Sequence, residues 1–202
     1  MLGNEIEAEY KGLPVVYPQS ISEWRNWLEE FHNSAKSVWV LMFKKSTGIS
    51  SITYNEALDE ALCFGWIDSK SNKRDEQSFY QIFSPRNPKS NWSRVNKNKI
   101  AVLEEQGKMA PKGREMVELA KRTGTWTALD LVEDLFIPQE MQQLFSQFPN
   151  AKSHYEAFPR SVKRGILEWI YSSKTDGTKM KRIRTTVELA EQNIRANQYT
   201  AK

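Results

Sequence analysis

The sequence has few of the residues on which nucleophilic or metal-dependent catalysis relies, with a single cysteine, Cys63, and two histidines, His32 and His154, among 202 residues. One cysteine excludes an internal disulfide framework and any site in which several cysteines hold a metal. The two histidines lie far apart in the chain without a spaced carboxylate motif, which is weak evidence for metal binding or general-base chemistry. We therefore expect no metal site, no cofactor and no catalytic residue, and we expect Cys63 to be a buried, inert thiol.

Long apolar runs are also absent, and no stretch approaches the length of a membrane span. The acidic start, residues 1–7, lacks the apolar segment of a secretory signal, so we expect a cytoplasmic protein. The phosphate-cradling glycine loop, the Gly-x-Ser-x-Gly elbow and the metalloprotease helix motif do not occur. An uncharacterised enzyme stays open as an alternative, because a fold can bring distant residues into one pocket.

Large aromatic side chains are plentiful, with 7 Trp, 9 Phe and 7 Tyr, although the mean hydropathy is −0.65. This combination predicts a charged surface around a core built from large rings. Residues 1–68 hold 5 Lys/Arg against 10 Asp/Glu, whereas residues 69–202 hold 24 against 15. A basic half of this kind can attract nucleic acid, anionic lipid or a small acidic ligand, and it can equally be a solvated face.

Hydrophobic periodicity predicts an α+β fold in the first part of the chain. Helical spacing indicates a helix over residues 21–32, and a short run of strand formers indicates a buried strand over residues 37–43. Thr53 and Glu56 have the spacing of a capping box, which starts a helix that ends near Gly65. Two strands then follow near residues 66–68 and 78–83. We expect a small mixed or antiparallel sheet with helices, forming an N-terminal domain over residues 1–88.

From residue 89 onward the pattern is helical almost everywhere. Apolar positions at helical spacing and the stop signals Gly107 and Gly124 mark the first two helices. Pro138 suits the first helical position of another, and the last helix is expected near residues 179–196. We expect a helical C-terminal region over residues 89–202, packed on the first domain as one structural unit.

A basic cluster with one tryptophan follows the second predicted strand. Arg86, Lys89 and Arg94 lie around Trp92, and no acidic residue occurs between residues 86 and 99. This pattern is typical of an anion site, in which arginine grips phosphate or carboxylate and the indole offers a stacking surface. The alternative is that Trp92 anchors the core and the cations form a solvated helix face.

A second basic cluster contains Lys179, Lys181, Arg182 and Arg184. If the last helix begins near residue 179, these cations lie at its positive end, where the helix dipole disfavours them and favours an anion. If the boundary lies a few residues away, the cluster is in the middle of the helix. The predicted ligand-binding residues are Arg86, Lys89, Trp92, Arg94, Lys179 and Arg182.

The stretch from residue 61 to residue 96 also carries two motifs. They are Cys63-Phe64-Gly65-Trp66-Ile67-Asp68, and Pro85-Arg86 followed by Ser90, Trp92-Ser93 and Asn96. At this separation they resemble the signature of the YdeI/OmpD-associated family, often called bacteriocin-protection proteins. The resemblance runs from about Trp24 to Ile194. It implies a stress-protection role against bacteriocins or cationic antimicrobial peptides, and it carries over no catalytic residue.

Two features depart from the family pattern. Ser173-Lys174 and Thr178-Lys179 stand where the family usually has Ala-Lys and Thr-Arg, and lysine keeps the charge but loses the planar fork of arginine. Association with a porin is suggested only by the family name, so we do not transfer that partner. The leading hypothesis is a non-enzymatic bacteriocin-protection protein that binds an anionic small ligand. A nucleic-acid-binding protein and an uncharacterised enzyme are the alternatives.

Overall fold

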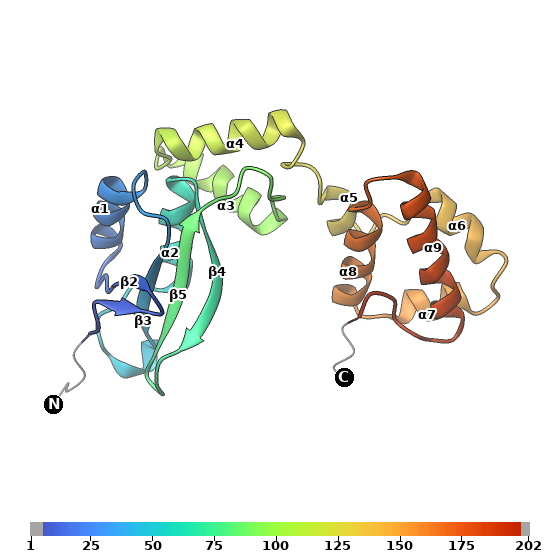
Figure 1. The fold of residues 1–202 in the computed structure, drawn as a ribbon, viewed down its shortest axis with the longest axis horizontal. Helices are drawn as coiled ribbons and strands as arrows, with labels where there is room; N and C mark the ends of the chain where they lie inside the picture. The colour runs from blue at the N-terminus through green and yellow to red at the C-terminus, as the bar shows by residue number, and fades with distance from the viewer. Residues whose placement is uncertain (1–5, 199–202) are drawn as a thin grey trace. The chain divides into compact units, whose positions relative to one another are not determined.

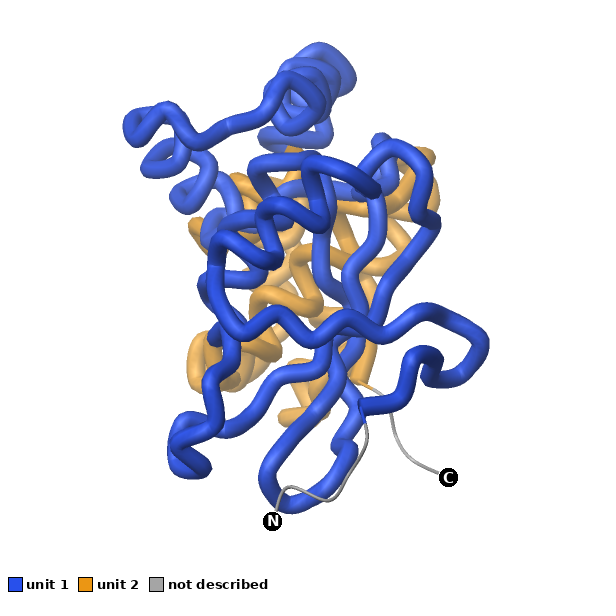
Figure 2. The backbone as a smooth tube through the Cα atoms, turned by 90° about the vertical axis from the view of Figure 1, so that its left-hand side faces the viewer, with its two compact units in different colours: residues 1–127 blue, residues 128–202 orange. Residues whose placement is uncertain are grey.

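The computed structural model describes residues 6–198, which form two compact units that divide between Thr127 and Ala128 (Figure 2). The first unit is an α+β structure and the second is helical (Figure 1). Both findings confirm the predicted fold class. The first unit includes the two helices that follow the sheet, which belong to the region expected to be helical.

A five-stranded mixed sheet forms the centre of the first unit (Figure 1). Its strands are β1 (Glu9–Tyr10), β2 (Leu13–Val16), β3 (Val38–Phe43), β4 (Trp66–Lys73) and β5 (Ser78–Pro85). The order across the sheet is β1-β2-β3-β5-β4. Among the strand pairs of the described residues, β2–β3 is parallel and the others are antiparallel, and β4 and β5 form a hairpin. The predicted strands are confirmed, and β4 continues five residues beyond the expected end at Asp68.

Side chains on both faces of β3 are buried, which explains its unbroken apolar sequence. Val38, Val40 and Met42 pack into the main core with the helices, whereas Trp39 and Leu41 pack on the opposite face. The helices on the main-core side are α1 (Ile21–Phe31) and α2 (Tyr54–Cys63). The 3₁₀ turn η1 (Lys45–Thr47) follows β3.

Helix α2 begins and ends where local sequence chemistry predicts. Both hydrogen bonds of the capping box between Thr53 and Glu56 are present. Gly65 follows the helix with a φ of 74°, a left-handed conformation that glycine adopts without a side-chain penalty. The residues of β4 therefore start directly after the helix that they pack against.

Helices α3 (Arg94–Glu105) and α4 (Pro111–Thr123) complete the first unit. Ile100 and Leu103 of α3 and Val117 of α4 belong to the same core as α1 and α2. Gly124, with a φ of 79°, ends α4 as predicted. Both helices therefore belong to the main core of the first unit.

The second unit consists of five helices within the described residues. They are α5 (Asp130–Glu133), α6 (Gln139–Phe145), α7 (Ala151–Ala157), α8 (Arg160–Tyr171) and α9 (Asp176–Glu191). Met141, Ile166 and Ile183 are fully buried in its separate core. Helices α5 and α7 were not predicted, because four and seven residues are too few for a clear apolar period.

Two predicted helix starts in the second unit differ from the structure, by one residue for α6 and by three residues for α9. Pro138 is the residue before the first turn of α6, not its first helical residue. Helix α9 begins at Asp176, three residues before the expected start, because the Thr175 hydroxyl accepts a hydrogen bond from the Thr178 amide and caps the helix there.

Candidate functional site

Arg86 is held at the end of β5 by backbone and side-chain contacts. Its amide donates to the Gly65 carbonyl at 2.9 Å, and its guanidinium donates to the Asn91 carbonyl. The guanidinium carbon lies 3.9 Å from the centre of the Trp92 ring. Only 6% of Arg86 and 2% of Trp92 are exposed. The predicted pair is therefore in direct contact, but it is buried.

The Arg86 charge is poorly compensated at this place. Its Nε is buried and has no hydrogen-bond partner among the described residues. Burial lowers the pKa of Arg86 to about 10, and the charge of Asp68 opposes this shift. A buried polar atom without a partner costs free energy, so an arginine kept here needs an explanation other than packing alone.

The Arg86–Trp92 stack continues into a larger set that we call the tryptophan–cation cluster: Arg86, Trp92, Lys97, Lys121 and Trp126. The two indole rings lie 5.0 Å apart. The ammonium groups of Lys97 and Lys121 lie 5.8 Å and 5.9 Å from the centre of the Trp126 ring. Three cations thus contact two neighbouring indoles, an arrangement stabilised by cation–π attraction.

Trp126 and Lys121 were missed as site residues. Trp92 is too deeply buried to be the exposed stacking surface that the sequence suggested, whereas Trp126 is only partly buried. The position of Trp126, two residues after the stop signal Gly124, could have marked it as the cap of the preceding helix. No pattern in the sequence predicts the contact of Trp126 with Trp92.

Lys89 and Arg94 flank Trp92 on the connection from β5 to α3. Lys89 is exposed on a turn in which the Ser90 amide donates to the Asn87 carbonyl at 3.0 Å. Arg94 is the first residue of α3, directly after Ser93, whose hydroxyl caps the helix. Both predicted residues therefore lie on the short segment that also supplies Trp92.

The other two predicted residues, Lys179 and Arg182, belong to the second unit. Lys179 Nζ forms an ion pair with Glu140 at 2.8 Å. The Arg182 guanidinium lies 5.1 Å from the Trp169 ring and donates to the Trp169 carbonyl and the Ser172 hydroxyl. Because α9 starts at Asp176, these cations follow an acidic first turn, and the expected conflict with the helix dipole does not arise.

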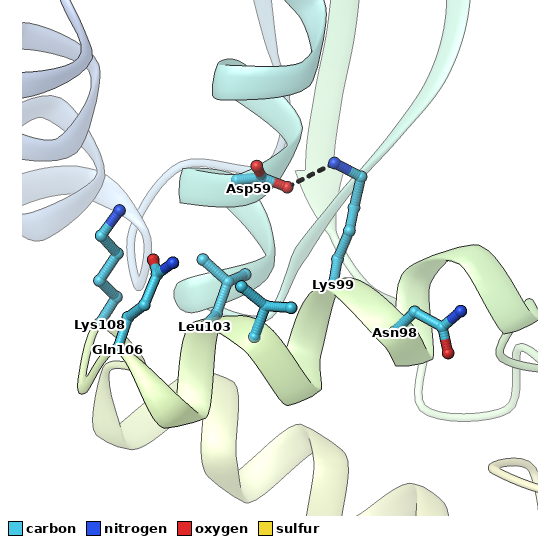
Figure 3. A pocket seen from close by; sticks show the side chains of 7 residues that line it. Asp59, Asn98, Lys99, Leu103, Gln106 and Lys108 are labelled. Atoms are coloured by element: carbon cyan, nitrogen blue, oxygen red, sulfur yellow. Dashed lines mark hydrogen bonds and ion pairs between the residues drawn. The ribbon is translucent and has the colours of Figure 1, made fainter.

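A separate pocket of about 440 Å³ lies in the first unit between α2 and α3 (Figure 3). Its lining residues are Asp59, Asn98, Lys99, Val102, Leu103, Gln106 and Lys108. Lys99 reaches across from α3 and pairs with Asp59 at 2.7 Å. The pocket is small enough for one low-molecular-weight ligand.

Cys63 is buried in the first unit, and the two histidines belong to different units of the chain. Cys63 is fully buried, and burial, with a contribution from Glu60, raises the pKa of its thiol to about 11. His32 lines a pocket with Phe64 that includes neither Cys63 nor Asp68. His154 lies in the second unit, where Nδ1 contacts the Ala190 carbonyl at 2.9 Å. Among residues 6–198, no group of His, Cys, Asp and Glu is arranged to hold a metal ion.

No helix in the described part of the chain is both long enough and apolar enough to cross a membrane.

Two families match the sequence. Residues 16–116, half of the chain, match the family described as a domain of unknown function (DUF8412), and residues 134–193 match the family described as bacteriocin-protection, YdeI or OmpD-associated. No curated protein and no solved structure matches the chain. The second match confirms the predicted family, although the motifs of residues 61–96 lie within the segment that matches the first.

Proposed function

Because the chain belongs to the family described as a domain of unknown function and its second part carries a bacteriocin-protection, YdeI or OmpD-associated region, we propose that it is a bacteriocin-protection protein whose first unit binds an anionic ligand. The proposed site is the tryptophan–cation cluster together with Lys89 and Arg94. The proposed site is confined to the first unit, so Lys179 and Arg182, which belong to the second unit, are not part of it.

The observation that carries the proposal is the buried Arg86 cation. It stacks on Trp92, no carboxylate lies within ion-pairing distance of it among the described residues, and its Nε has no hydrogen-bond partner there. Replacing such a cation by an apolar side chain is often neutral or stabilising, so stability does not explain it. A positive potential directed at a bound anion does explain it, and the exposed Lys89 would make the first contact.

Phosphate is the anionic group that suits these residues best. Arginine binds phosphate oxygens through its planar fork, and lysine acts as a point charge that tolerates several geometries. Trp126 adds a partly buried aromatic surface that the ammonium groups of Lys97 and Lys121 contact. A phosphate-bearing ligand with a planar group would use both features.

Nucleic acid is the second candidate. It is favoured by the contact of Trp126 with two lysines, since proteins that bind single strands combine stacking rings with basic side chains. The two candidates differ in salt dependence. An extended nucleic acid releases several counterions and loses affinity steeply with salt, whereas a small ligand with one phosphate loses less.

The test is equilibrium binding of inorganic phosphate, pyrophosphate and a labelled single-stranded oligonucleotide at low and near-physiological salt. We expect the triple variant Lys89→Ala, Lys97→Ala, Lys121→Ala to weaken binding at least tenfold. The control is Lys36→Ala, which removes an exposed lysine outside the cluster. Binding that is equal in the wild type and the triple variant, or absent for all three probes at low salt, contradicts the proposed site.

The protective role needs a second experiment in cells. Bacteria that express the wild-type chain are expected to survive a bacteriocin challenge better than bacteria with an empty vector. The triple variant should lose this advantage at equal protein level, and Lys36→Ala should keep it. If the triple variant protects as well as the wild type, the protective role does not depend on the anion site.

A further inference from the structure

The pocket between α2 and α3 contains polar side chains that have no partners. Lys108, Asn98 and Gln106 are exposed, and within the described residues their side chains form no hydrogen bond or ion pair. Figure 3 shows Lys108 and Gln106 at one end of the pocket and the pair of Asp59 and Lys99 beyond Leu103. The lining thus offers hydrogen-bonding capacity that the chain itself does not use.

Hydrogen bonds to Arg25 and Leu103 hold the backbone of Lys108 in place. Its carbonyl accepts a hydrogen bond from Arg25 Nη2 at 3.2 Å, and Arg25 Nη1 pairs with the buried Glu60 at 2.8 Å. The Lys108 amide donates to the Leu103 carbonyl at 3.0 Å, which closes the turn at Gly107. An anchored backbone keeps the segment that carries the Lys108 side chain in place, so this segment need not become ordered when a ligand binds.

The charge balance of the pocket favours an anion. Lys99 already neutralises the charge of Asp59, so Asp59 does not favour a cationic ligand. Lys108 leaves one positive charge without a counter-charge among the lining residues. A ligand with one negative charge would neutralise the pocket and form a charge-assisted hydrogen bond, with the Gln106 amide as a second donor.

The pocket lining between its two polar ends is apolar. Val102 is 50% exposed although it is a β-branched apolar side chain, and Leu103 beside it is buried. Apolar surface of this kind loses contact with water when a hydrocarbon covers it, which is favourable. A ligand that is anionic at one end and apolar along its body matches this order of side chains.

We propose that the pocket between α2 and α3 binds a small organic carboxylate with a short apolar chain. The carboxylate contacts Lys108 and Gln106, and the chain lies over Val102 and Leu103. The Asp59–Lys99 pair lies at the other end of the pocket, beyond the apolar chain of the ligand. This site is separate from the tryptophan–cation cluster and shares no residue with it.

The experiment is an NMR titration of the full chain with sodium hexanoate, compared with hexanol and hexylamine as neutral and cationic probes of the same length. Hexanoate is expected to shift the amide signals of residues 106–108 and the methyl signals of Val102 saturably. Hexanol should bind roughly tenfold more weakly, because it lacks the charge. Hexylamine should not compete with hexanoate. Equal binding of hexanoate and hexanol, shifts confined to other regions, or no saturable shift would overturn the proposal.

Two variants test the named contacts. Lys108→Met keeps the length of the side chain, and it should weaken hexanoate binding about tenfold while hexanol binding stays unchanged. Val102→Ala should weaken both ligands alike, because it removes apolar contact and adds no polar group. Lys36→Met is the matched control, since Lys36 is exposed and lies outside the pocket. Unchanged selectivity for hexanoate in Lys108→Met would also overturn the proposal, and an unaltered spectrum elsewhere shows that each variant is folded.

Discussion

Gly113 of α4 lies directly against the last residue of α2, so that a Cβ atom at Gly113 would come within 2.1 Å of the Cys63 carbonyl oxygen. No rotamer change can relieve a clash with backbone, so α4 would have to move away from α2. We expect Gly113→Ala to lower the free energy of unfolding of the first unit by about 2 kcal/mol or more, measured by urea denaturation.

Gly165 in α8 provides the matched control for this substitution. A Cβ atom there meets no atom within 4 Å, and its φ is not in the left-handed region. Gly165→Ala should therefore stabilise the second unit by roughly 0.5–1 kcal/mol, through the better helix propensity of alanine. A Gly113→Ala protein as stable as the wild type would show that α4 does not approach α2 this closely.

The second prediction distinguishes the contribution of Arg86 to the stability of the fold from its contribution to anion binding. Arg86→Met keeps much of the side-chain volume over Trp92 and removes a charge whose pKa is lowered to about 10 by burial. We expect the free energy of unfolding to stay within about 1 kcal/mol of the wild type or to rise. Anion binding at the tryptophan–cation cluster should fall at the same time.

A clear loss of stability in Arg86→Met, without a change in anion binding, would show the opposite. Arg86 would then be a structural residue that holds the Asn91 carbonyl and Trp92 in place.

The third prediction concerns Lys179 and Arg182 in the second unit. The pair of Lys179 and Glu140 is partly exposed, so Lys179→Ala should change the free energy of unfolding by less than about 1 kcal/mol. Arg182 instead packs over Trp169 and donates to the end of α8, and Arg182→Ala should cost about 1–2 kcal/mol. Thermal unfolding of both variants, side by side, measures the difference.

The fourth prediction follows from Tyr54 and Tyr80 and concerns alkaline pH. Burial, together with a hydrogen bond to Asp68, raises the pKa of Tyr54 to about 12. Burial and a hydrogen bond to Glu7 raise the pKa of Tyr80 to about 12 as well. A tyrosine in the unfolded chain ionises near pH 10, so the unfolded state loses its proton first.

The contribution of the two tyrosines to stability is thus complete below about pH 10 and is lost as the pH rises to about 12. Denaturant titrations at several pH values should show this decline. Replacing both residues, Tyr54→Phe and Tyr80→Phe, should make the decline shallower, and an identical pH dependence would contradict the assignment.

The fifth prediction concerns the thiol of Cys63. It is fully buried and burial raises its pKa to about 11, so few thiolates exist at neutral pH and reagents cannot reach them. Iodoacetamide should label the native protein far more slowly than the urea-denatured protein. Rapid labelling of the native protein near neutral pH would instead identify Cys63 as a reactive residue.

Local interactions explain which parts of the fold the sequence predicted well. The Thr53–Glu56 capping box, the stop at Gly65 and the strand formers of β3 act within a few residues, and all three were confirmed. The predicted start of α9 was wrong because it was placed at the basic cluster. The hydrogen bond from the Thr178 amide to the Thr175 hydroxyl caps the helix a few residues earlier. Short helices such as α5 were missed, because their stability comes from packing rather than from their own period.

The sequence by itself determined the α+β class, the family and the basic composition around Trp92, since each depends on residue type and short spacing. Only the tertiary structure decided that Trp92 is buried in contact with Arg86 and Trp126. It also decided that Lys99 pairs with Asp59, 40 positions away in the sequence. The physical reason is that burial and pairing depend on which distant segments the core brings together, and no local propensity carries that information.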